Sequence, residues 1–438
     1  MKRVLITLAM LVTASAWADA QTLTLHNCLE KGLENNYSLR ISRNQEEVAH
    51  NNATLANAGY LPSIDLNAGY NADLANSDSK LRTTGETTEV RNSFDQSLNA
   101  GIGVSWTIFD GFKISTNYKQ LKELERMGEL NTRITLEDFI AGLTAEYYNF
   151  IHQKLRLANY YYAVKLSKER LRIVEERYNI GNFSRLDYQQ AKVDFNADSA
   201  QYIKQQEVVL TSRIALNEMM AIDEVYTPIE TNESTIVSDT TLQFGQLWEK
   251  MLANNAALLL ANRSNTLAEL DYKKVISRNY PYVRLNAGYD YTFNKYDTNS
   301  YTSRSNWGGS AGVTVGFNLW DGNRKRERRN AKIEIENAQL ERNRIELALK
   351  AELGNLWQAY RNNIQLLNLE KQNVITAREN HEIAKERYML GDISGIEMRE
   401  AQKSLLDAEQ RLLSVEYDTK LCEISLLQIT GEVTNYLK

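Results

Sequence analysis

Apolar and polar residues alternate with a period of two along four segments of the chain, which is typical of β-strands with two different faces. In the first segment Ile64 and Leu66 alternate with Asp65, which belongs to the opposite face. Three further segments repeat the pattern, at residues 100–108, 283–293 and 311–319. We predict four strands that form two hairpins, one at residues 63–109 and one at residues 282–320.

The lengths and end residues of these strands favour a membrane over a soluble sheet. Each alternating stretch spans about nine to eleven residues, the length of a tilted bilayer crossing, and aromatic residues gather near its ends, as in outer-membrane girdles. A half-buried sheet in a soluble domain is the alternative, because alternation alone fits both. The polar links at residues 73–93 and 294–305 are expected to be extracellular loops.

The first twenty residues indicate that the chain is exported. Lys2 and Arg3 precede an apolar run that ends in small residues, Ala18-Asp19-Ala20. This arrangement predicts a secretory signal peptide at residues 1–20.

Long helices are expected after each hairpin. Asp110-Gly111 and Asp321-Gly322 are each followed by about 70 residues without a proline, so no such residue interrupts a helix there. The last part of the chain keeps mostly apolar residues at three–four spacing, which predicts coiled-coil packing. These residues are Ala401, Leu405, Ala408, Leu412, Val415, Thr419, Cys422, Leu426 and Ile429.

Each long helix is expected to end in a tight turn and to continue as a second, antiparallel helix. Gly181 and Gly391 suit a left-handed C-cap. Ser184 and Ser394 follow as N-caps, each with a carboxylate three positions later, in the position of a capping box. We call these two turns the first tip and the second tip.

The chain repeats itself with a spacing of about 210 to 219 residues, the sign of a duplicated unit. LPSIDLNAGY (Leu61–Tyr70) returns as YPYVRLNAGY (Tyr280–Tyr289), and both tips lie in matching segments. We predict repeat 1 at residues 21–222, an equatorial linker at 223–241, repeat 2 at 242–430 and a C-terminal tail at 431–438. Each repeat contains strands and helices, so the fold class is α+β.

Four strands do not close a barrel, because known membrane-spanning barrels start at about eight strands and an open sheet edge is not tolerated in lipid. The barrel is therefore expected to be shared between chains. Two chains would give eight strands with a filled interior, whereas three would give twelve strands and a lumen.

Composition and motifs argue against several other functions. The formal net charge of −5 does not favour nucleic acid as a partner. The four histidines show no metal-ligand spacing with each other or with the cysteines, and no nucleophile motif or phosphate-binding glycine loop occurs. We therefore predict that the chain is not an enzyme and has no cofactor. Cys28 and Cys422 either form a disulfide or are buried free thiols.

Duplicated strand pairs, long helices and an export signal together resemble the TolC family of outer-membrane efflux proteins. The most specific parts are the paired YxxGxxSxx(D/E) tips, at residues 178–187 and 388–397, and the Asp-Gly strand exits. The resemblance implies a homotrimer in the outer membrane of a Gram-negative bacterium, with a twelve-stranded barrel in outer membrane lipid and a periplasmic coiled-coil tunnel. It also implies two partners, a periplasmic adaptor protein and an inner-membrane pump of the RND or ABC type.

The resemblance further implies a gate at the tips. Glu397 and Glu400 match the carboxylates of the family's periplasmic constriction. Asp187 matches an acidic position of the first tip, and Tyr388 matches a lock position. Three copies of a carboxylate near a threefold axis would repel one another and favour cations. Acids in a first helical turn also stabilise the helix itself, so both roles stay open. Ile393 departs from the best-studied pattern of the family, in which a basic residue at this position ties the closed tip to its neighbour.

The tip residues are the surface that the resemblance assigns to the adaptor. They are Gly181, Asn182, Ser184, Gly391, Asp392 and Ser394.

The leading hypothesis is a passive exit duct of a tripartite efflux system or a type I secretion system, gated at the periplasmic tips. The alternative is an outer-membrane-anchored structural or adhesive coiled-coil protein. The cargo stays open between drugs, metal ions, siderophores and proteins, because the lining of such a tunnel does not select.

Overall fold

The computed structural model describes residues 23–437, apart from residues 232, 234 and 300. The expected signal peptide at residues 1–20 lies outside the described residues. The elements follow in the order α1 (Leu25–Asn35), α2 (Tyr37–Asn52), α3 (Leu55–Ala58), β1 (Ser63–Lys80), β2 (Thr87–Phe109), α4 (Lys113–Asn179), α5 (Arg185–Met219), α6 (Phe244–Asn254), α7 (Ala256–Ser277), β3 (Tyr282–Lys295), β4 (Ser303–Gly316), α8 (Asn323–Leu390), α9 (Gly395–Ile429) and the 3₁₀ helix η1 (Val433–Leu437).

The chain divides into two compact units, and each unit contains segments of both repeats. The helical unit holds the residues up to Arg43, Thr132–Leu258 and the residues from Ile345 onward. The strand unit holds Asn44–Asn131 and Leu259–Arg344. Each compact unit is therefore built from parts of both repeats, and the boundaries of the units differ from those of the repeats.

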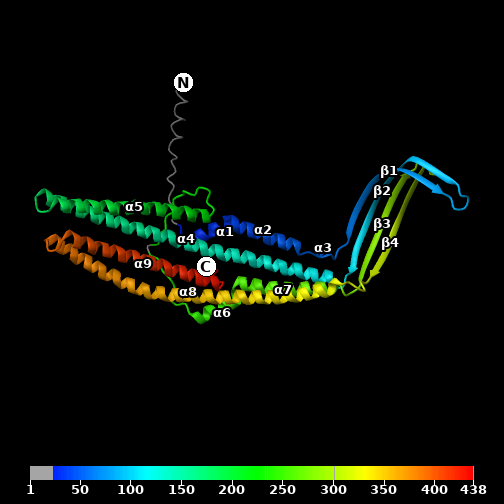
Figure 1. The fold of residues 1–438 in the computed structure, drawn as a ribbon. Helices are drawn as coiled ribbons and strands as arrows, with labels where there is room; N and C mark the ends of the chain where they lie inside the picture. The colour runs from blue at the N-terminus through cyan, green and yellow to red at the C-terminus, as the bar shows by residue number, and fades with distance from the viewer. Residues whose placement is uncertain (1–22, 232, 234, 300, 438) are drawn as a thin grey trace, which may run out of the picture. The chain divides into compact units, whose positions relative to one another are not determined.

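The four strands form one antiparallel sheet in the order β1-β2-β3-β4 (Figure 1). The register places the apolar positions of neighbouring strands on the same face: Leu66 pairs with Ile102, which pairs with Tyr289 on its other side. Most large apolar side chains of this face are exposed in the single chain. They include Ile64, Leu66, Tyr70, Leu98, Ile102, Trp106, Tyr289, Val313 and Val315.

The first hairpin is longer than the apolar pattern predicts. β1 has 18 residues and β2 has 23, so the chain at residues 73–93 is mostly paired strand and not a free loop. Backbone hydrogen bonds hold this polar end, since a ladder continues without apolar side chains once its register is set. The register shifts between Ala75 and Ser77, and Asn92 has a φ of +53°, which indicates a bulge.

The second hairpin ends earlier than predicted. β3 and β4 each have 14 residues, and β4 ends at Gly316. The segment 317–320 is therefore outside the strand, although we assigned it to the hairpin. The alternation of Phe317 and Leu319 continues the strand pattern, but no partner strand pairs with this segment.

The long helices are uninterrupted. α4 has 67 residues and α8 has 68, and each forms a hairpin with the helix that follows it (Figure 1). The seam predicted for α9 packs inside the helical unit: Ala401, Leu405, Ala408, Thr419, Leu426 and Ile429 are buried. Within the described residues, no helix has the length and apolar character that a membrane crossing requires.

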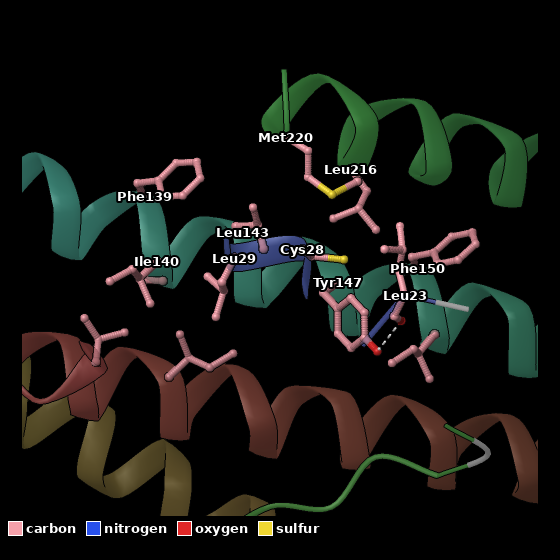
Figure 2. Packing of buried hydrophobic residues seen from close by; sticks show 14 of the residues in the cluster. Leu23, Cys28, Leu29, Phe139, Ile140, Leu143, Tyr147, Phe150, Leu216 and Met220 are labelled. Atoms are coloured by element: carbon pink, nitrogen blue, oxygen red, sulfur yellow. Dashed lines mark hydrogen bonds between the residues drawn. The ribbon is translucent and has the colours of Figure 1, made fainter. Parts of the chain in front are cut away.

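The main core of the helical unit lies where α1 meets α4 and α5. Leu29, Leu143 and Leu216 are fully buried there, and the Tyr147 hydroxyl donates a hydrogen bond to the Leu23 carbonyl at 3.3 Å (Figure 2). Cys28 is buried in the same cluster, and burial raises the pKa of its thiol to about 12. Both Cys28 and Cys422 are free thiols, and Cys422 is only partly buried, so the structure has the free residues and not the disulfide.

Two histidines are buried in the helical unit, and neither ring nitrogen of either one makes a hydrogen bond within the described chain. His152 of α4 stacks on Tyr417 of α9, with ring centroids 4.9 Å apart. Burial, and to a smaller extent the charge of Arg156, lowers the pKa of His152 to about 4. Burial also lowers the pKa of His381.

Acid is expected to destabilise this core. The unfolded chain binds a proton on His152 near its ordinary pKa of about 6.5, whereas the folded chain keeps the ring neutral down to about pH 4. Stability is therefore complete above pH 6.5 and falls as the pH drops toward 4. The thermal midpoint of the purified protein, followed by near-ultraviolet circular dichroism, should fall less with acid in His152→Phe, which keeps the ring stack. Equal pH slopes in both proteins would contradict this assignment.

Candidate functional site

Both tips close as predicted, on a glycine with a left-handed backbone. Gly181 has a φ of +83° and Gly391 a φ of +88°. The amides of the next residues, Asn182 and Asp392, donate to the carbonyls of Arg177 and Arg387 at 2.8 and 2.9 Å. A Cβ atom on either glycine would meet no atom within 4 Å. The backbone conformation, and not lack of space, therefore favours glycine at both positions.

A complete capping box follows each tip. The Ser394 hydroxyl accepts a hydrogen bond from the Glu397 amide at 3.2 Å, and the Glu397 carboxylate accepts one from the Ser394 amide at 2.8 Å. Ser184 and Asp187 make the same pair of bonds, at 3.2 and 3.1 Å. The hydrogen bonds that the Ser394 amide and hydroxyl donate to the Glu397 carboxylate lower the pKa of Glu397. Both acids thus stabilise their own helix, which is one of the two roles we considered for them.

Three of the predicted gate residues line one hollow of about 320 Å³ between the two tips. Asp187 comes from α5, Tyr388 from α8 and Glu400 from α9. Glu400 is exposed and makes no hydrogen bond or ion pair among the described residues. Glu397 does not line the hollow. The tip residues assigned to the adaptor (Gly181, Asn182, Ser184, Gly391, Asp392 and Ser394) are exposed.

Tyr388 is buried between the two hairpins. It is 4% exposed, and its hydroxyl has no hydrogen-bond partner within the described residues. The Arg177 guanidinium of α4 lies 5.8 Å from the centre of its ring and donates to the Met389 carbonyl at 3.1 Å. Burial raises the pKa of the Tyr388 phenol. Arg177 of α4 therefore contacts the end of α8 twice, at the Met389 carbonyl and at the face of the Tyr388 ring.

Ile393 packs against apolar side chains at the second tip. It contacts a buried cluster that contains Tyr388, Met398 and Ala401.

The sequence analysis missed the ion pairs that join the helices behind the tips. The Arg399 guanidinium of α9 binds both carboxylate oxygens of Asp198 on α5, at 2.6 and 2.7 Å. Arg170 of α4 pairs with Asp194 of α5. Arg399 and Asp198 are only 23% and 12% exposed. A bidentate, largely desolvated pair of this kind is stronger and more directional than a surface ion pair.

An alignment of the two repeats distinguishes these residues, because each of them is charged in one repeat and has an uncharged counterpart in the other. With the tip glycines aligned, Arg399 corresponds to Gln189 and Asp198 corresponds to Ala408. The other pair differs in the same way, since Arg170 corresponds to Asn380 and Asp194 to Ser404. Glu400 likewise corresponds to Gln190. At these five positions, a charge that occurs in only one copy lines the hollow or joins the two hairpins.

The hollow combines charged side chains with a buried aromatic ring, so it can act on charged solutes and on access between the hairpins. The hollow is lined by both acids and arginines, and no three His, Cys, Asp or Glu side chains in the described part of the chain are placed to hold a metal ion.

Comparisons with known proteins agree with this fold. The family model for outer membrane efflux proteins matches residues 28–221 and 247–432. The chain is 24% identical over 434 residues to the outer membrane protein TolC of Vibrio cholerae, covering 97% of this chain and 93% of the relative. The structure is similar to that of the outer membrane protein VceC of Vibrio cholerae (TM-score 0.75, 17% identity, 95% and 98% of the two chains). It is also similar to the outer membrane channel CmeC of Campylobacter jejuni (TM-score 0.79, 15% identity, 95% and 87%).

Removal of the second cap should loosen the second tip without unfolding the protein. Ser394→Ala deletes the hydroxyl that accepts from the Glu397 amide, a change that costs about 1 kcal/mol at a helix N-cap. Amide hydrogen exchange in residues 396–398 should accelerate about fivefold, as expected for that loss of local stability. Ser404→Ala, an exposed serine inside α9, is the matched control. Equal exchange in the two variants would show that the capping box does not hold the tip.

Proposed function

This chain belongs to the outer membrane efflux protein family, and from that premise we propose that it is a passive exit duct of the outer membrane, gated where its helical tips meet. The family match in two copies, over residues 28–221 and 247–432, is the observation that carries the proposal. The helices supply the tunnel and the sheet supplies the membrane anchor. Energy for transport comes from a partner, because the chain has no nucleotide-binding motif.

The sheet supports a shared barrel. β1 and β4 each pair on one side only, and an edge of unpaired backbone groups is not tolerated in lipid. The exposed apolar face, which includes Leu66, Ile102 and Val313, matches the lipid-facing side of such a barrel. Three copies give twelve strands and a lumen, whereas two give a filled interior. A homotrimer is therefore the assembly that serves transport.

The hollow between the tips supports a gate with an acidic constriction. Glu400 is exposed and unpaired within the described chain, whereas Glu397 and Asp187 are engaged as caps. In a trimer, three Glu400 carboxylates near the axis would repel one another, favour hydrated cations and make closure depend on pH. Tyr388 and the Arg399–Asp198 pair would hold each second hairpin against the first in the closed state.

The partners follow from the same proposal. The exposed tips, including Gly181, Asn182, Ser184, Gly391, Asp392 and Ser394, are the surface offered to a periplasmic adaptor protein, and an inner-membrane pump of the RND or ABC type supplies the energy. The chain is then neither an enzyme nor an adhesin. In an adhesin we would expect apolar contacts along the whole seam, and the charged lining of the hollow at the tips would have no role.

Glu400→Ala is expected to change conduction. Loss of three carboxylates from a narrow, low-dielectric constriction lowers its preference for cations and removes part of the barrier. Single-channel recordings in planar bilayers should show a higher conductance or a lower cation-to-anion permeability ratio. Glu379→Ala, an exposed carboxylate on α8 that lines no part of the hollow, should leave both values unchanged. If Glu400→Ala also leaves them unchanged, Glu400 has only a helix-stabilising role.

Deletion of the gene is expected to make whole cells retain a fluorescent efflux dye, and a plasmid copy should restore export. Proteins released to the medium are measured in the same cultures. Normal dye export together with a missing secreted protein would assign the duct to protein secretion. Normal dye export and an unchanged set of released proteins would contradict the exit-duct proposal.

A further inference from the structure

The junction between β4 and α8 exposes two large apolar side chains at the end of a strand. Leu319 and Trp320 are 86% and 84% exposed. They line a hollow of about 450 Å³ together with Ile276 of α7 and with Lys325 and Arg328 of α8. Large aromatic side chains at this position, directly after a membrane-spanning strand, are typical of the interface between lipid and water.

A stripe of cations begins at the same hollow. Lys325, Arg328, Arg329 and Lys332 are all exposed, and at 100° per residue they lie within an arc of about 100° on one face of α8. None of the four makes an ion pair in the described part of the chain. We call these four residues the basic stripe.

The electrostatics of a helix N-terminus do not explain why the basic stripe lies at the start of α8. The N-terminal end of a helix favours anions, because its free amides and macrodipole are positive, yet the first turn of α8 contains no acidic residue. Cations four positions apart, such as Lys325 and Arg329, also repel each other. The nearby acids Asp321 and Glu327 both pair with Arg278, which directly follows α7, and neither forms an ion pair with the basic stripe. An anion from outside the chain would remove this cost.

The first repeat lacks both the charges and the open face. With the Asp-Gly exits aligned, Lys325, Arg328 and Arg329 correspond to Ile114, Asn117 and Tyr118.

Protein covers that first-repeat face. The Asn117 amide donates to the Ala58 carbonyl at 3.3 Å, and the Tyr118 ring contacts Tyr60, with centroids 6.2 Å apart. The second repeat therefore carries a cationic and exposed surface at this place, where Arg328 Nε donates to the Tyr272 hydroxyl of α7 at 3.3 Å.

We propose that the hollow and the basic stripe bind the headgroup phosphate of an anionic phospholipid from the periplasmic leaflet of the outer membrane. The Trp320 ring and Leu319 lie at the acyl boundary, and the cations contact the phosphate. Arg324 also lines the hollow, although its guanidinium is held by the chain, because Nη2 donates to the Asn318 carbonyl at 2.6 Å. The charge complementarity and the position directly after β4 favour a lipid over other anions. The inference rests on the proposed function for the membrane crossing of β4.

The test compares lipid binding in matched variants of the purified full-length protein. Lys325→Gln/Arg329→Gln removes two cations of the basic stripe, and Lys113→Gln/Lys119→Gln removes two exposed cations from the matching start of α4. Native mass spectrometry of the detergent-solubilised protein, titrated with phosphatidylglycerol or phosphatidylcholine, reports the affinity for each lipid. The wild type and the Lys113/Lys119 variant should prefer phosphatidylglycerol. The Lys325/Arg329 variant should lose roughly tenfold or more of that preference.

Three results would overturn the proposal: no preference in the wild type, an equal loss in both variants, or full displacement of the lipid by millimolar inorganic phosphate, which would indicate a site for free anions. Preferential binding of purified peptidoglycan, which carries carboxylates, would assign the basic stripe to the cell wall instead.

If the double variant does not assemble, Lys325→Gln and Arg329→Gln are compared singly with Lys113→Gln. Single-channel conductance in the Lys325/Arg329 variant separates this test from that of the duct, because conduction should persist when lipid binding is lost.

Discussion

The unpaired backbone groups along the outer edges of β1 and β4 are the constraint on which the rest of the molecule depends. Each of these strands has a neighbour on one side only, and every N–H or C=O left without a partner in lipid costs several kcal/mol. A single chain therefore does not satisfy its own sheet in lipid, and in the proposed trimer identical copies supply the missing strands. In the proposed trimer, symmetry then brings each tip residue close to its own copies. In that trimer each Glu400 carboxylate lies near the Glu400 carboxylates of the two other copies. Because the copies are identical, a substitution changes all three residues at once.

The sequence predicted the features that local rules decide. Strand alternation follows from the pleat, and the tips follow from the left-handed glycines and the serine caps, so both are visible in short segments. The polar part of the first hairpin was missed, because backbone pairing extends it to Lys80 without an apolar signal. The Arg399–Asp198 pair joins residues 201 positions apart. It depends on which helix faces meet, and no periodic pattern in one segment contains that information.

The two repeats share their fold but differ in their contacts at two places, the tips and the strand exits. At both places the aligned residues of the two repeats differ in charge. At the tips, charges that occur in one copy only form the ion pairs between helices and line the hollow. At the strand exits, the first repeat packs Ile114 and Tyr118 where the second exposes cations. Duplication thus supplied a scaffold with two equivalent halves. Divergence then gave each half a different surface, since two identical hairpins would offer only identical side chains to each other.

Each tip satisfies its own backbone hydrogen bonds through a glycine turn and a serine cap. Separation of the two hairpins would therefore break only side-chain contacts, such as those of Arg177 and Arg399, and would leave every turn folded. The free energy needed to separate the two hairpins then depends on the contacts of a few side chains and not on the turns of the backbone. Single substitutions at these contacts, or at apolar positions such as Ile393, could therefore change how firmly the two hairpins hold together while the shape of each turn stays constant.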